Sequence, residues 1–360
     1  MKRLVFTVTN DLVYDQRMIR ICTSLSNNYD VLLIGRELRT SPELKKQQFK
    51  QKRLKCFFQK GIFFYLEYNI RLFFFLLQPR YDLICTIDLD TILPCYFVSI
   101  LKNKKRIYDA HELFCEMKEV VTRKHVYKVW SGIENWLVPK FKYGYTVNTP
   151  IRDIFLKKYN VSYEVIRNVP FLLPLHKTAE EKFIIYQGSV NHGRSFETLI
   201  PAFKYIDVPL HIYGDGNFLK VAEELVHKYQ LGNRVIFKGK ADPEKLKFIT
   251  STAIMGITIF ENNGLSNYLS LANRFFDYIH AGIPQICVDY PAYREINDRF
   301  KIAKLISDLS PRALAMDINE LLYDQTLQMQ IRENCLIARE ELNWQKEEQK
   351  LISFYKNIFD

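Results

Sequence analysis

Short apolar runs alternate with segments of helical periodicity along almost the whole chain, and this alternation restricts the fold more than any other feature. The first series of apolar runs covers 3–9, 29–35, 81–87, 105–110 and 143–148. A second series covers 182–187, 209–214, 233–239, 253–260, 284–289 and 303–307. Continuous apolar strands joined by helices are typical of a parallel sheet covered on both faces. We therefore predict an α/β chain with two doubly wound, Rossmann-like domains that face a cleft.

A stretch with three prolines followed by polar residues separates the two series and indicates a linker at 169–181. The 360 residues are enough for two domains with separate cores. We expect an N-terminal domain at 1–168 and a C-terminal domain at 182–335. Residues 336–360 are helical and highly charged, and we expect this segment to pack back on the N-terminal domain.

The composition excludes several classes of protein. With 48% hydrophobic and 25% charged residues, the chain is neither disordered nor fibrous. Its seven cysteines show no C-x-x-C pair and no spacing suited to zinc, so we expect reduced thiols and a cytoplasmic protein. The chain enters a strand at its start, and no apolar run approaches 18 residues. We therefore expect neither a signal peptide nor a membrane span.

The net charge of +11 is unevenly spread. Residues 36–80 contain eleven Lys and Arg against three Glu, interleaved with Phe and Tyr. Such a segment suits contact with an anionic membrane surface. It equally suits an apolar core with a solvated basic face, because apolar periodicity alone does not separate the two. Nucleic acid is a weaker interpretation, since no nucleic-acid-binding module accompanies the charge.

Residues 188–195 read GSVNHGRS, between an apolar run and a helical pattern. This differs by one residue from the G-x-x-x-x-G-K-[ST] loop that holds nucleotide phosphates. Gly188 and Gly193 let the backbone approach a ligand, and Arg194 can bond phosphate oxygens in bidentate fashion. Arg does not replace the compact Lys that reaches terminal phosphates, so we predict phosphate binding without nucleotide hydrolysis. The alternative is a glycine turn with a surface Arg.

A second candidate site follows the run at 253–260. A helical segment that ends near Gly282 carries Asp277 among apolar residues. A carboxylate there is suited to accept hydrogen bonds from a ribose diol. Alternatively, it interacts with the helix dipole or pairs with Arg274.

In the first half, polar residues follow three apolar runs. Asp109, His111 and Glu112 form the densest cluster, and we expect them to line the cleft. Asp88 and Asp90 either cap the next helix or line the acceptor side. A metal site there is disfavoured because the phosphate loop lies in the other domain. The first run is followed by Asn10, Asp11, Asp15 and Arg17. These residues line an acceptor pocket, or alternatively Asn10 or Asp11 is the N-cap of the next helix.

The order of several motifs resembles that of GT-B glycosyltransferases of family 4. In the second half these are YQGSVNHGRSFETLIPAF, IYGDGN, VIFKGKADPEKL and SLANRFFDYIHAGIPQIC. In the first half they are VTNDLVYDQRMIRICTSL, IDLDTILP, IYDAHELF and YTVNTPIRD. The resemblance covers nearly the whole chain. It implies retaining transfer of a sugar from a nucleotide-diphosphate sugar without a metal or another cofactor.

The resemblance also implies roles for individual residues. The donor would be bound by Gly188, Asn191, Gly193, Arg194, Gly214, Lys240, Ser270, Leu271, Asn273, Arg274 and Asp277. Catalysis would involve His111 with Asp109 and Glu112, and the acceptor would meet Asn10, Asp11, Asp15, Arg17, Asp88 and Asp90. The expected acceptor is a glycan or lipid-linked glycan of surface polysaccharide or glycoconjugate synthesis. The expected location is the cytoplasm, with 36–80 contacting the inner membrane face.

One position departs from the family pattern. Members often carry two Glu with seven residues between them, whereas this chain has Leu269 and Asp277 at these positions. Two other hypotheses therefore stay open: a GT-B enzyme of another kind, such as a nucleotide-sugar epimerase, or a non-catalytic protein that binds nucleotide-sugar. A phosphorylase would need a lysine-bound pyridoxal phosphate, for which the sequence has no supporting motif.

Overall fold

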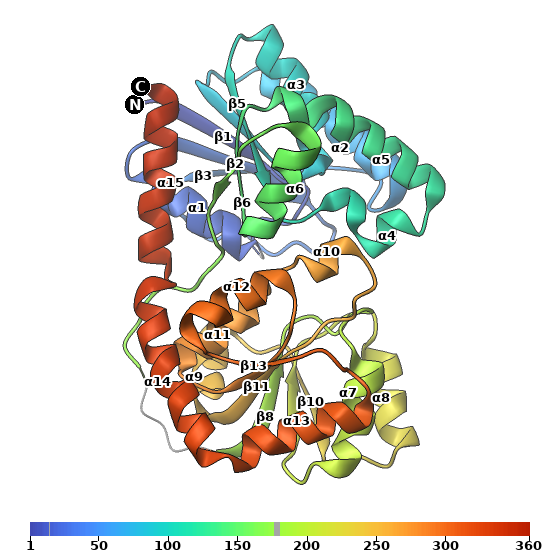
Figure 1. Ribbon diagram of the computed structural model, residues 1–360. Coiled ribbons are helices and arrows are strands. Elements are labelled where there is room, and N and C mark those ends of the chain that lie inside the picture. Colours follow the sequence, from blue (N-terminus) through green and yellow to red (C-terminus); the bar gives the residue numbers. More distant parts are fainter. Residues whose placement is uncertain (14, 176–180) are drawn as a thin grey trace. The chain divides into compact units, whose positions relative to one another are not determined.

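The computed structural model describes residues 1–13, 15–175 and 181–360. The chain divides into two compact units, coloured mostly blue to green and yellow to orange in Figure 1. The first unit consists of residues 1–168 and 347–360, and the second of residues 169–346. Each unit is built around its own parallel sheet.

The sheet of the first unit has the strand order β3-β2-β1-β4-β5-β6-β7, and all pairings are parallel. Its strands are β1 (Arg3–Thr7), β2 (Asp30–Glu37), β3 (Lys50–Lys55), β4 (Leu83–Ile87), β5 (Lys105–Ala110), β6 (Tyr143–Thr146) and β7 (Glu164–Val165). The strand order reverses between β1 and β4. The carboxyl edge of the sheet therefore has its topological switch point at these two strands.

Helices cover both faces of this sheet (Figure 1). They are α1 (Gln16–Ser26), α2 (Gly61–Leu77), α3 (Ile92–Leu101), α4 (Lys118–Val121), α5 (Lys124–Leu137) and α6 (Thr149–Tyr159), with 3-10 turns at Leu89–Thr91, Phe114–Glu116 and Val138–Lys140. Successive strand residues point to opposite faces. Val5 packs with Tyr68 of α2, whereas the ring of Phe6 lies 6.0 Å from that of Tyr355 in α15 (Trp344–Phe359). Burial on both faces explains why the central strands β1 and β4 are mostly apolar.

The sheet of the second unit has the order β10-β9-β8-β11-β12-β13, again all parallel, and its order reverses between β8 and β11. Its strands are β8 (Glu181–Gln187), β9 (Leu210–Tyr213), β10 (Val235–Gly239), β11 (Ala253–Thr258), β12 (Gln285–Val288) and β13 (Lys304–Ile306). Its helices are α7 (Phe196–Ala202), α8 (Leu219–Lys228), α9 (Pro243–Thr252), α10 (Leu265–Tyr268), α11 (Asn273–Ala281), α12 (Pro291–Phe300), α13 (Pro311–Tyr323) and α14 (Gln325–Glu341), with a 3-10 turn at Phe203–Tyr205. The prediction of two doubly wound α/β sheets is confirmed.

The helical segment expected at 336–360 is divided between the units. Helix α14 packs on α11, α12 and α13 of the second unit. The chain then turns at Asn343, whose side chain bonds the backbone of both helices, and α15 begins. Of the segment 336–360, residues 347–360 belong to the first unit, so the second unit ends at 346 and not at 335. The expected linker at 169–181 is described as far as 175, where it belongs to the second unit, and residues 176–180 lie outside the described residues.

Two further findings concern the whole chain. All seven cysteines are free thiols, and all but Cys56 are buried. Among the helices that the structure describes, none is long and apolar enough to cross a membrane.

Candidate functional site

Both units place polar side chains just after the strands that flank the switch point of their sheet. In the first unit these strands are β1 and β4, with β5 beside β4, and in the second they are β8 and β11. Ligands of open parallel sheets bind at this position. Each unit therefore carries a candidate binding region at the carboxyl edge of its sheet.

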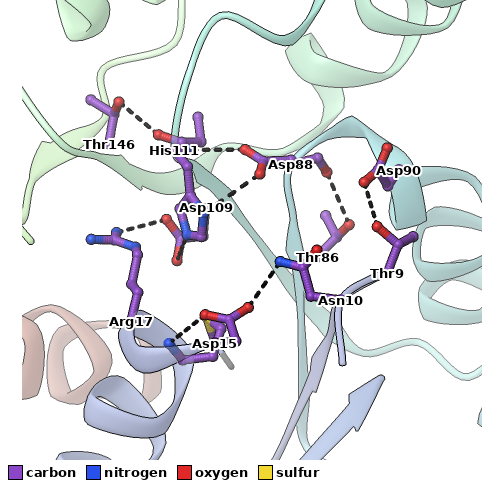
Figure 2. A network of polar contacts seen from close by, with 12 residues as sticks. Thr9, Asn10, Asp15, Arg17, Thr86, Asp88, Asp90, Asp109, His111 and Thr146 are labelled. Carbon is purple, nitrogen blue, oxygen red and sulfur yellow. Dashed lines mark hydrogen bonds and ion pairs between the residues drawn. The ribbon is translucent and has the colours of Figure 1, made fainter. Parts of the chain in front are cut away.

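Asp109 of β5 is completely buried between two cations (Figure 2). Arg17 Nη2 donates to Asp109 Oδ1 at 2.9 Å, and His111 Nε2 lies 3.2 Å from Asp109 Oδ2. Burial raises the pKa of the Asp109 carboxyl, but Arg17 and His111 outweigh it and bring this pKa below its ordinary value. Burial lowers the pKa of His111, but Asp109 and Asp88 raise it to about 8. At neutral pH Asp109 is therefore ionised and His111 is protonated.

Asp88 follows β4 in a backbone conformation that favours glycine, with φ +50° and ψ −171°. A non-glycine residue persists there only when its surroundings fix it, and such residues cluster at functional sites. The Asp88 amide donates to the Asp109 carbonyl at 2.9 Å, and the His111 amide donates to Asp88 Oδ1 at 2.9 Å. Burial raises the pKa of Asp88 to about 7, although His111 lowers it, and the charge of Glu112 raises it further.

Asp90 lies beside this cluster. Thr9 Oγ1 donates to Asp90 Oδ2 at 2.6 Å, and burial raises the pKa of Asp90 to about 6. Neither Asp88 nor Asp90 caps the following helix with its side chain, so the expectation of a helix cap is wrong for both. Within the described part of the chain, no group of three or more His, Cys, Asp or Glu is arranged to hold a metal ion.

The residues after β1 divide between two environments. Asp15 is the N-cap of α1, accepting from the Met18 amide at 3.0 Å, and it also accepts from Asn10 Nδ2 at 3.2 Å. The cap is therefore Asp15 and not Asn10 or Asp11. Asp11 instead is buried against Arg53 of β3, whose Nη2 lies 2.5 Å from Asp11 Oδ1. The structure thus separates Asp11 from the cluster around Asp109.

Figure 2 shows that the cluster also contains threonines that the sequence did not single out. Thr9 bonds Asp90, Thr86 Oγ1 donates to the Asp88 carbonyl at 3.4 Å, and Thr146 Oγ1 donates to the Ala110 carbonyl at 2.8 Å. Thr86 and Thr146 are buried hydroxyl residues at or near the end of a strand. That position is the signal by which they could have been found.

In the second unit, the loop after β8 interlocks with the loop after β9 through glycines. Gly188 and Gly193 have φ of +124° and +81°, in the region that favours glycine. A Cβ on Gly214 would lie 1.8 Å from the Gly188 carbonyl oxygen, and a Cβ on Gly216 would lie 2.3 Å from Asn191 Oδ1. Asn191 Oδ1 also accepts from the Asn217 amide at 3.0 Å. Glycine is therefore required for the two backbones to approach this closely.

Two arginines flank the ring of Phe260, which follows β11. The guanidinium carbons of Arg194 and Arg274 lie 4.5 and 4.6 Å from the ring centroid. Arg274 is buried and donates to the carbonyls of Gln187 and Ile259 at 3.4 and 3.3 Å. Both arginines were predicted to bind the nucleotide-sugar donor. In the structure Arg274 fixes the strand ends, whereas Arg194 is half-buried on the loop itself.

Asp277, on α11, faces the end of β8. Gln187 Nε2 donates to Asp277 Oδ2 at 2.8 Å, and Thr250 Oγ1 donates to Gln187 Oε1 at 2.6 Å. The carboxylate is half-buried. This chain of hydrogen bonds fixes its orientation at the carboxyl edge of the sheet.

The other predicted donor residues lie near the same edge and are less buried. Ser270 and Leu271 are half-buried just before α11, and Asn273 is exposed at its start. Lys240 follows β10, is exposed, and forms an ion pair with Asp215 after β9, at 3.2 Å.

A polar chain borders the glycine loop, and its two asparagines were not singled out from the sequence. The Glu261 amide donates to the Gly193 carbonyl at 3.1 Å. Asn263 Nδ2 donates to Glu261 Oε2 at 2.5 Å, and Asn267 Nδ2 donates to Asn263 Oδ1 at 2.8 Å. By contrast, Leu269 is buried and apolar, with 5% of its surface exposed. The segment Asn262-Asn263-Gly264, rich in turn residues after a strand, was the available signal.

Comparison with known proteins gives a partial family match and a shared fold. Residues 174–336 match the family model described as glycosyl transferases group 1. No curated protein matches the chain. Among solved structures, sucrose-phosphate synthase from Thermosynechococcus elongatus is similar at a TM-score of 0.82 and 16% identity, over 100% of this chain and 99% of that one.

Two more solved structures are similar over nearly their full lengths. Anabaena HepE in complex with UDP and glucose has a TM-score of 0.79 and 13% identity, covering 99% of this chain and 100% of that one. The apo lipopolysaccharide outer core galactosyltransferase WaaB has a TM-score of 0.66 and 12% identity, covering 99% of each chain. At such identities these likenesses show the two-sheet GT-B fold.

Proposed function

We propose that this chain, whose residues 174–336 match the glycosyl transferases group 1 family model, is a GT-B glycosyltransferase that moves a sugar from a nucleotide-diphosphate sugar to a glycan or lipid-linked glycan. The transfer retains the anomeric configuration and serves surface polysaccharide or glycoconjugate synthesis. One observation carries the proposal: inside the group 1 region, a loop that requires glycine and bears Arg194 lies at the switch point of a parallel sheet.

The donor diphosphate lies against the loop 188–194 in this proposal. Gly188 and Gly214 bring backbone close to the ligand because neither carries a side chain. Arg194 donates two hydrogen bonds to phosphate oxygens. As the bond between sugar and phosphate breaks, negative charge grows on the diphosphate, and a guanidinium already held on Phe260 stabilises it without reorganising. We propose that this fixed charge serves in place of a metal ion.

The nucleoside and the sugar take neighbouring positions. Asp277 accepts from the ribose hydroxyls, since an oriented carboxylate has lone pairs beyond those that Gln187 uses. Leu269 offers no hydrogen bond to a sugar. We propose that Glu261, Asn263 and Asn267 recognise the sugar hydroxyls instead, because they form a polar chain beside Gly193.

The cluster of the first unit serves the acceptor and the transferred sugar. His111 is protonated at neutral pH and holds two carboxylates around it, so its ring is oriented rather than free to act as a base. Burial raises the pKa of the Asp88 and Asp90 carboxyl groups. Either group can therefore accept a hydrogen bond from a hydroxyl of the acceptor sugar or, when protonated, donate one to it. The acceptor proton passes to the departing phosphate. We also propose a cytoplasmic protein that associates with the inner membrane face through the region 36–80.

The test screens a panel of nucleotide-diphosphate sugars. Binding is measured by thermal shift, and slow hydrolysis of the donor is measured without acceptor. The expected result is stabilisation by one nucleoside diphosphate and by its sugar conjugates. Product analysis with glycan and lipid-linked acceptors then reports transfer. Conversion of the donor to a new nucleotide-sugar without acceptor would indicate an epimerase. Binding without turnover would indicate the non-catalytic alternative that Leu269 suggests. If no nucleotide binds, the proposal fails.

A further inference from the structure

Helix α2 is apolar on the side that faces solvent. Ile62, Leu66, Ile70 and Phe74 follow one another at four-residue spacing and are 73%, 58%, 49% and 61% exposed. The stripe Phe64, Tyr68, Leu72 and Leu76 is buried against the sheet. A helix on the surface of a globular domain normally presents polar residues to water. The outward stripe of α2 is therefore an exposed apolar surface that no other part of the described chain covers.

Helix α3 packs beside α2, and α5 packs on α3 (Figure 1). Exposed apolar side chains continue from α2 across these two helices. A shallow hollow between α2 and α3 is lined by side chains of both helices, among them Leu66, Ile70, Phe74 and Phe97. Phe97 of α3 lies 6.0 Å, centroid to centroid, from Trp136 of α5, and both rings are more than two-fifths exposed. At the end of α3, Leu101 is 67% exposed. We call the surface formed by Ile62, Leu66, Ile70, Phe74, Phe97, Leu101 and Trp136 the α2–α3–α5 face.

A fixed tip of two phenylalanines precedes α2. Glu67, the only carboxylate of α2, accepts from the amides of Phe57 and Phe58, both at 3.0 Å, and from Arg71 Nε at 2.8 Å. The Arg71 guanidinium lies 5.4 Å from the Phe57 ring centroid. These contacts hold Phe57 at 80% exposure and Phe58 at 51%. Glu67 thus fixes the backbone of the two exposed phenylalanines instead of adding a free charge to the outer side of α2.

The segments that carry the α2–α3–α5 face are rich in cations. The segments 52–77, 92–106 and 123–137 together contain twelve Lys and Arg against two Glu. One of these is Glu67, and the other, Glu134, is buried and bonded to Tyr159 and Lys158. Lys60 before α2 and Lys124 and Lys128 on α5 are exposed. An apolar centre with a basic rim matches a surface with apolar depth and anionic head groups.

We propose that the α2–α3–α5 face docks on an anionic lipid bilayer, with the apolar stripe and the Phe57–Phe58 tip among the acyl chains and the basic rim at the head groups. A second copy of the chain fits less well, because a two-fold interface would bring the same basic rim against itself. The inference deepens the proposed peripheral location and rests on it, but it does not depend on the sugar transferred.

The test is co-sedimentation of the full chain with phosphatidylcholine vesicles, with and without phosphatidylglycerol. The expected result is binding that requires phosphatidylglycerol. The triple variant Ile62→Ser, Leu66→Ser, Phe74→Ser should bind at least about tenfold more weakly, since each serine removes several methylene-sized groups from lipid. A matched triple, Met316→Ser, Tyr323→Ser, Ile337→Ser, replaces side chains of the second unit that are 72%, 68% and 62% exposed and should bind like the parent.

A second pair of measurements separates the sources of failure. Lys60→Ser with Lys124→Ser and Lys128→Ser should weaken binding and reduce its dependence on salt. The proposal is overturned if the parent binds neutral and anionic vesicles equally, or if the triple stripe variant binds vesicles as well as the parent does. It is also overturned if the parent binds no vesicles but forms a dimer that the stripe variant does not form. The stripe variant should keep the parent's melting temperature and its donor hydrolysis without vesicles. Vesicle binding by a chain that binds no nucleotide would leave this inference standing while the proposed function fails.

Discussion

At the scale of single residues, Arg194 is the side chain on which the donor proposal depends most. Replacing it with Ala should weaken the cognate nucleoside diphosphate about 10- to 100-fold, because a charged hydrogen-bonding group contributes about 1.5–3 kcal/mol. The bare nucleoside should bind as before. Titration calorimetry with both ligands measures the difference, and Arg312→Ala, an exposed arginine of α13, is the control. Equal losses for both ligands would remove Arg194 from the phosphate site.

Glu261 allows a separate test of sugar recognition. Its replacement by Gln should leave the affinity for the nucleoside diphosphate unchanged and weaken the nucleotide-sugar by about 5- to 30-fold, because a carboxylate accepts hydroxyl hydrogen bonds more strongly than an amide does. Competition binding with the two ligands reports this. Glu244→Gln, on α9 and exposed, should change neither affinity. A loss shared by both ligands would instead indicate that Glu261 supports the loop at Gly193.

His111 gives the first unit a predicted pH dependence. Its pKa is about 8 in the folded chain and about 6.5 when unfolded. The stabilisation is therefore fully present below about pH 6.5, is lost as pH rises through 8, and amounts to roughly 2 kcal/mol. The pKa of Asp88, raised to about 7, acts in the same direction, because the folded state favours its protonated form. Chemical denaturation of His111→Gln should show a flatter decline in unfolding free energy between pH 6 and pH 9.

The control for this pH profile is His125→Gln, because His125 is exposed on α5. Its unfolding free energy should follow the parent at every pH. A parent profile that rises from pH 6 to pH 9 would contradict the protonated state assigned to His111.

At the scale of elements, the two interlocked loops of the second unit should tolerate no side chain at their contact. Gly214→Ala places a Cβ against the Gly188 carbonyl, so we expect a loss of at least about 1–3 kcal/mol in the unfolding free energy of this unit, together with weaker nucleotide binding. Gly232→Ala is the matched control, because nothing lies within 4 Å of its added Cβ. Thermal denaturation with and without nucleotide distinguishes the two variants.

The sequence predicts elements well where burial alone determines the residue pattern. The inner strands of both sheets are recognisable because helices cover both of their faces. Strand β3, KQKRLK, escapes this pattern because edge strands carry charge. For α2 the sequence could not choose between core and membrane, because both sides of the helix are apolar. The structure shows one stripe in the core and the other exposed.

The candidate site was predictable in its residue types but not in its partners. The positions after strands pointed to Asp109, His111 and Arg194, since ligand-binding residues of parallel sheets gather there. The pairing of Arg17 with Asp109, 92 residues apart, depends on the packing of α1 on the sheet and has no local signal. The same holds for Arg274, whose buried guanidinium binds strand ends that only the fold brings together.

At the scale of the whole molecule, the two units should unfold as separate cooperative bodies, because each has its own sheet and core. Scanning calorimetry should resolve two transitions, and the cognate nucleoside diphosphate should raise only that of the second unit. Tyr355→Ala should lower only that of the first unit, by about 10 °C, since a buried aromatic is worth about 3–5 kcal/mol. Lys356→Ala, exposed on the same helix, should lower neither. A single transition that shifts in all cases would show that the units unfold together.

The division of α15 between the units has a consequence for how the chain is made. Tyr355 covers Phe6 and Tyr145, yet the ribosome adds it only after the entire second unit has been synthesised. During translation, the first sheet to emerge therefore keeps part of its apolar face exposed to water. The second unit, by contrast, is complete once residue 346 has been added. The unit made first is completed last. A nascent chain of this protein should accordingly need a chaperone over its oldest strands until residues 347–360 arrive.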